Sequence, residues 1–130
     1  MIRKLAMAMC LVLLVSLCAA CGGESGWIYD LPKGYTLHCV DGSVCVEQNG
    51  EQALDYGVTA FCTGARYVGI RQEHGTADGT ETVYFLLDTE NSVFYSAQDE
   101  AEFEDVLESL SVTDLGAWIE TSKKPSGAHN

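Results

Sequence analysis

The fold is decided by Thr82-Val83-Tyr84-Phe85-Leu86-Leu87, the most hydrophobic strand that the sequence predicts. β-Branched, aromatic and aliphatic residues follow one another here, which indicates a strand covered on both faces. The turn residues Asp88-Thr89-Glu90-Asn91 come next, and residues 93–95 predict a strand that returns alongside. We therefore expect the quoted stretch to lie at the centre of a sheet.

A helix is predicted directly downstream, from about Ala97 to Leu110. Its apolar residues recur at i, i+3, i+4 and i+7, which is one stripe of a helix; they are Phe103, Val106, Leu107 and Leu110. Ser96 followed three residues later by Asp99 resembles a capping box at the helix start. The acidic residues lie mostly off the stripe and are expected to face solvent.

Upstream of the central strand, short alternating segments predict further strands, at residues 35–40, 44–48, 58–62 and 67–71. The polar, glycine-rich residues 73–80 are expected to form a loop. Strands first and a helix last predict an α+β domain, with a small antiparallel sheet of about five to six strands and the amphipathic helix packed on one face. Residues 120–130 contain little to bury and are expected to be a disordered tail.

The N-terminus has the residue order of a secretory signal. Arg3 and Lys4 precede an apolar run from Leu5 to Leu17, and small residues follow. A membrane-spanning helix is the alternative, but the sixteen residues from Leu5 to Ala20 would form a helix only about 24 Å long, shorter than a hydrocarbon core of about 30 Å. Residues 1–20 are therefore predicted to be a signal peptide, built on a signal helix.

The segment Leu17-Cys18-Ala19-Ala20-Cys21-Gly22-Gly23 resembles a bacterial lipobox. The resemblance implies a lipoprotein precursor that is cleaved after Ala20 and carries a diacylglyceryl group on the sulfur of Cys21. The usual leucine lies three residues before the modified cysteine, whereas here that position is Cys18. A plain secreted protein is the alternative. Because two acyl chains suffice for stable anchoring, we expect a protein anchored by lipid to the extracytoplasmic face of the cell membrane.

Length and charge bound the mature protein. Removal of the signal leaves 110 residues, which we divide into a tether (21–26), one domain (27–119) and the tail. The net charge of the whole chain is −12, and loss of Arg3 and Lys4 makes it −14. A chain with this charge is not expected to bind nucleic acid or to bind anionic lipid electrostatically, since both kinds of binding require clustered Lys and Arg.

Three cysteines remain besides Cys21, namely Cys39, Cys45 and Cys62. A three-residue loop at residues 41–43 would place Cys39 opposite Cys45, and we predict this disulfide, with Cys62 left as a thiol. Asp41-Gly42 is also a strong signal for a two-residue turn. That register would place His38 opposite Cys45 and would favour a Cys45–Cys62 bridge.

The sequence contains no recognisable catalytic motif. His38 adjoins Cys39, but the spacing fits no zinc template, and His74 lies in a polar segment. Residues 88–91 lack the glycine and the closing glutamate of a calcium loop and are expected to be a solvated turn. No nucleophile is placed beside a base. We therefore predict no enzyme, no catalytic residue, no metal and no cofactor.

The mature chain resembles a family of small Gram-positive lipoproteins that is catalogued only as a domain of unknown function. The matching segments are Leu31-Pro32-Lys33-Gly34-Tyr35, Tyr84-Phe85-Leu86-Leu87-Asp88, and Glu102-Phe103 with Leu107 and Leu110. The three mature cysteines depart from that family pattern. The resemblance implies a lipoprotein but no catalytic residues.

Three functions are compatible with these features. The first is a membrane-anchored module that binds an unidentified envelope protein. The second is a lipid-anchored immunity or inhibitor protein that uses its acidic face against a basic toxin. The third is a small extracytoplasmic enzyme or metal-binding protein built from His38, Cys39 and carboxylates.

Overall fold

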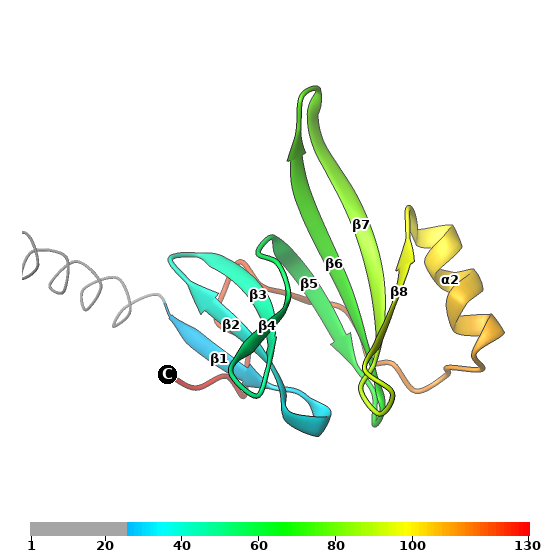
Figure 1. Ribbon diagram of the computed structural model, residues 1–130, viewed down its shortest axis with the longest axis horizontal. Coiled ribbons are helices and arrows are strands. Elements are labelled where there is room, and N and C mark those ends of the chain that lie inside the picture. Colours follow the sequence, from blue (N-terminus) through cyan, green and yellow to red (C-terminus); the bar gives the residue numbers. More distant parts are fainter. Residues whose placement is uncertain (1–25) are drawn as a thin grey trace, which may run out of the picture.

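The computed structural model describes residues 26–130 as three layers, two antiparallel sheets and one helix (Figure 1). The α+β class is confirmed, but the strands form two sheets in place of one. The first sheet has the order β1-β2-β3-β4 and the second β8-β7-β6-β5-β9. The predicted signal helix, the tether and Cys21 lie outside the described residues, except for Gly26. Within residues 26–130, no helix is both long and apolar enough to cross a membrane.

The elements of the first sheet are β1 (Trp27–Asp30), β2 (Tyr35–Val40), β3 (Ser43–Gln48) and β4 (Glu51–Leu54), with a 3₁₀ turn at Pro32–Gly34. Those of the second are β5 (Val58–Thr63), β6 (Tyr67–Thr76), β7 (Gly79–Asp88), β8 (Val93–Ala97) and β9 (Ile119–Glu120). The helix α2 (Glu100–Ser109) follows β8.

The turn between β2 and β3 consists of two residues, Asp41 and Gly42. Asp41 and Gly42 have φ values of 58° and 79°, the left-handed conformation that a type I′ hairpin turn requires at both positions. Val40 therefore pairs with Ser43, and Cys39 pairs with Val44.

This register explains why the predicted Cys39–Cys45 disulfide is wrong. Cys45 lies opposite His38, so the side chains of Cys39 and Cys45 point to opposite faces of the sheet. No disulfide joins Cys39, Cys45 or Cys62 in the described part of the chain. The alternative Cys45–Cys62 bridge is absent from these residues as well.

The loop predicted at residues 73–80 is also wrong. These residues extend β6 and β7 into a long hairpin, paired as far as Thr76 and Gly79. Figure 1 shows this hairpin projecting beyond the other strands. Its outer part is exposed on both faces, so the sequence there lacks the apolar alternation by which a half-buried strand is recognised.

The helix α2 covers one face of the second sheet. Its stripe of Phe103, Val106, Leu107 and Leu110 packs around Leu86 and Ala97, as predicted. The helix begins later than predicted, because β8 extends to Ala97. Asp99 is the N-cap, and its carboxylate accepts from the Glu102 backbone N–H at 2.8 Å, while Glu102 accepts from the N–H of Gln98 at 3.0 Å.

The first sheet covers the opposite face of the second. Leu37 and Val46 of the first sheet share one buried cluster with Phe61, Ile70 and Leu87 of the second. β7 is thus covered on both faces over its second half, as its unbroken apolar sequence predicts.

Residues 120–130 are not a disordered tail in this structure. Thr121 donates to the Val58 carbonyl at 2.8 Å, and His129 exchanges two backbone hydrogen bonds with Ile28, of 2.6 and 2.8 Å. The end of the chain therefore pairs with the outer edge of β1 (Figure 1).

Candidate functional site

One face of the first sheet gathers the only cysteine and histidine that lie opposite each other in the described residues. His38 of β2 pairs with Cys45 of β3, and Glu47 follows on the same face. The His38 Nε2 and Glu47 Oε2 atoms are 2.8 Å apart, without the geometry of a hydrogen bond. The cluster depends on the hairpin register, and it forms in the register of the two-residue Asp41-Gly42 turn, the alternative that the sequence left open.

The chemistry of this cluster does not favour a nucleophile. Burial raises the pKa of the Cys45 thiol, and the charges of Glu47 and Asp55 raise it further, against a hydrogen bond with Tyr56 that lowers it. A thiol must ionise to attack carbon or to bind metal. The raised pKa therefore disfavours the reactive thiolate form of Cys45.

The structure separates the residues of the hypothetical metal site. His38 and Cys39 are consecutive in β2 and point to opposite faces, and His74 lies on the exposed part of β6. Among residues 26–130, no group of three His, Cys, Asp or Glu side chains is arranged to hold a metal ion.

An open cleft of about 590 Å³ lies where the β2–β3 turn, the start of β5, the β6–β7 hairpin and β9 meet. Its charged centre is Arg71, whose Nη2 contacts both carboxylate oxygens of Glu120 at 2.9 and 2.8 Å. The Arg71 Nε donates to the Thr59 hydroxyl at 3.0 Å. These contacts tie β5, β6 and β9 together and leave a polar cleft, which could take a small polar group. The cleft has no local signal in the sequence, because its lining residues come from segments as far apart as Gly42 and Ser122.

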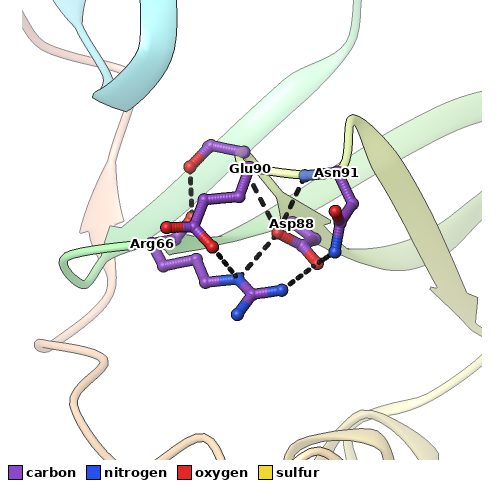
Figure 2. Close-up of polar contacts among 5 residues, drawn as sticks. Arg66, Asp88, Glu90 and Asn91 are labelled. Carbon is purple, nitrogen blue, oxygen red and sulfur yellow. Dashed lines mark hydrogen bonds and ion pairs between the residues drawn. The ribbon is translucent and has the colours of Figure 1, made fainter.

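A second polar cluster joins the β5–β6 turn to the end of β7 (Figure 2). Arg66 donates to both oxygens of Asp88, at 2.9 and 2.8 Å. The Asp88 carboxylate also accepts from the backbone N–H groups of Glu90 and Asn91 and from the Asn91 side chain, at 3.1, 3.3 and 3.0 Å. Asp88 and Thr89 are buried, so the solvated turn predicted over residues 88–91 is wrong at its start.

The charge of Asp88 is held by its hydrogen bonds. The guanidinium of Arg66, followed by the Asn91 side chain and backbone, keeps the pKa of this carboxyl well below its usual range, against the opposing effect of burial. The same ion pair raises the pKa of Arg66. These hydrogen bonds fasten the β5–β6 turn to the end of β7.

Cys62 lies between the second sheet and α2, beside a cleft of about 280 Å³ that Phe103, Leu107 and Trp118 also line. Burial raises the pKa of the Cys62 thiol to about 11.

We expect iodoacetamide at about pH 8 to label Cys62 in the folded protein at least about a hundredfold more slowly than in urea, because the thiolate is scarce. Peptide mass spectrometry of time points would measure both rates, and equal rates would show that the site opens freely.

Comparison with known proteins finds no match: neither a family model, nor a curated protein, nor a solved structure is similar to the chain.

Proposed function

We propose that this protein is a lipid-anchored binding module on the extracytoplasmic face of the cell membrane. The observation that carries the proposal is the cysteine motif at residues 17–23, which comes directly after an apolar signal-like run. Cys21 is the lipidated residue in this proposal, and residues 1–20 are the signal peptide. Its partners are membrane lipid, through the diacylglyceryl group of Cys21, and an envelope protein.

The start of the folded domain supports an anchor at Cys21. β1 begins at Trp27, six residues after the cysteine. A segment of that length spans at most about 20 Å when fully extended, so the anchor would hold the domain close to the bilayer surface. β1 pairs with β2 on one edge and with His129 on the other, and so the strand next to the anchor is fastened on both sides.

The surface favours binding of protein over binding of lipid. A mature net charge of −14 repels anionic headgroups, and the lipid would therefore provide the attachment while the domain remains available to a partner. The inhibitor or immunity hypothesis is a second candidate. It is favoured by the segment from Thr89 to Ser111, which contains seven acidic residues and no Lys or Arg.

The anchor is tested by Cys21→Ser in the producing cell, with metabolic labelling by a radioactive or clickable fatty acid. We expect labelling to be abolished and the protein to be released or to persist as precursor, because the acceptor sulfur is gone. Cys18→Ser is the matched control and should be labelled normally. Undiminished labelling of the Cys21 variant would contradict the lipoprotein assignment, and loss confined to the Cys18 variant would move the anchor to that residue.

A further inference from the structure

The outer edge of β8 is unpaired in the described structure. β8 is the last strand of the second sheet (Figure 1), and its backbone bonds reach only β7. The Gly64 N–H donates to the Tyr67 carbonyl at 2.9 Å, which fixes the alternation of the ladder from β5 outward. Following that alternation through β6 and β7, residues 93, 95 and 97 of β8 bond to β7. The N–H and C=O groups of Phe94 and Ser96 consequently point away from the sheet.

The three other sheet edges are protected in ways that β8 is not. β1 is paired with His129 and β9 has only two residues. β4 is short, carries Glu51 and has a register shift within its pairing with β3. Charge, shortness, irregularity and a covering segment are the usual means of keeping a strand edge from pairing with another chain. β8 has five residues, Val93-Phe94-Tyr95-Ser96-Ala97, without a charge, proline or glycine.

Acidic residues flank this edge at both ends. Glu90 precedes β8, and Asp99 and Glu100 follow it. The helix α2 packs on one face of the sheet through residues such as Phe103 and leaves its acidic side chains exposed. Ser96 pairs with Phe85, which packs on the side of the first sheet, whereas Ala97 packs on the side of α2. Ser96 is exposed, so β8 is open to an incoming chain on the face opposite the helix.

We propose that β8 binds an extended, basic segment of a partner protein, which adds to the second sheet as a further strand. The proposal deepens the proposed function, on which it rests, by naming the site and the chemistry of the partner. Backbone hydrogen bonds to Phe94 and Ser96 would provide affinity, as in other cases of strand addition. The flanking carboxylates would select Lys or Arg and speed the encounter. A second copy of this chain fits less well, because it brings the same negative charge to the same edge.

The test uses the protein as its host processes it, purified in detergent, and a peptide probe of about eight residues in which Lys alternates with Val. We expect Ser96→Pro to weaken binding at least about tenfold, because proline removes an outward N–H and crowds the edge. Ser96→Thr keeps the N–H and should bind like the wild type. Fluorescence anisotropy measures affinity, and circular dichroism melts confirm that both variants are folded.

Changes in the peptide test the same site without altering the protein. Replacing Lys by Glu, or N-methylating the alternate peptide nitrogens that would bond to β8, should each abolish measurable binding. Hydrogen exchange at Phe94 and Ser96 should slow when the Lys–Val peptide is present.

The proposal is overturned if folded Ser96→Pro binds equally well, or if a scrambled peptide with clustered Lys binds as tightly, since charge alone would then explain the affinity. Analytical ultracentrifugation provides a further test. If the wild type is a dimer and Ser96→Pro is a monomer, the proposal is also overturned, because the edge of β8 would then pair with a second copy of the chain. None of these outcomes bears on fatty-acid labelling of Cys21, so failure of the edge and failure of the anchor are distinguishable.

Discussion

Phe103→Ala is expected to destabilise the domain by about 3–5 kcal/mol, the range for deleting a buried aromatic ring. Phe103 is 2% exposed and is the one fully buried residue of α2. Its ring lies 5.5 Å from Trp118 and 5.8 Å from Tyr84, between centroids. Because a small domain is stable by only about 5–15 kcal/mol in total, this loss would remove a large part of the free energy of unfolding.

The neighbouring Glu104→Ala variant is the control for this prediction. Glu104 is exposed on the same helix, and we expect a change of less than about 0.5 kcal/mol. Urea denaturation followed by circular dichroism would measure both free energies of unfolding. Equal losses for the two variants would mean that the stripe of α2 does not face the core.

The sequence predicts best those strands and helices in which buried and exposed residues alternate with a regular period. The strand Tyr35–Val40 alternates buried residues with partly or fully exposed ones, and the sequence pattern predicts its observed bounds. The stripe of α2 was likewise correct, because one helix turn repeats within the sequence window. The start of α2 differs from the predicted one, because pairing of Ala97 with Tyr84 keeps β8 extended. This pairing joins two segments that are separate in the sequence.

Features that depend on distant pairing could not be predicted. The division into two sheets follows from which strands pair, and the order β7-β6-β5-β9 brings Ile119 beside Phe61. The ordered end of the chain rests on bonds such as Thr121 to Val58, which leave no periodic trace in the sequence.

The candidate sites also could not be predicted, because they depend on which strands pair and in which register. A shift of one residue in the β2–β3 register exchanges the faces of His38 and Cys39, so the same sequence allows either a disulfide or the observed pairing of His38 with Cys45. The outward groups of β8 follow only from the complete strand order.

Asp88→Asn is expected to cost about 3 kcal/mol of stability at pH 7, because it removes the charge that holds a hydrogen-bonded network. Asp88 is 2% exposed and accepts hydrogen bonds from Arg66, Glu90 and Asn91. Its folded-state pKa is lowered, chiefly by the hydrogen bonds from Arg66, from an ordinary value of 3.8. A carboxyl with a lowered pKa binds protons less readily when the protein is folded. Its stabilising effect is therefore complete above about pH 5 and is lost as the pH falls through and below about 4.

The difference in unfolding free energy between wild type and Asp88→Asn should consequently shrink on acidification. Urea denaturation at pH 7, 5 and 3 would measure it, with Glu90→Gln as the control. Glu90 also contacts Arg66, at 3.3 Å, but half of its side chain is exposed, so its replacement should change stability by less than about 0.5 kcal/mol. A penalty for Asp88→Asn that stayed constant from pH 7 to pH 3 would show that the network depends on the shape of the side chain and not on its charge.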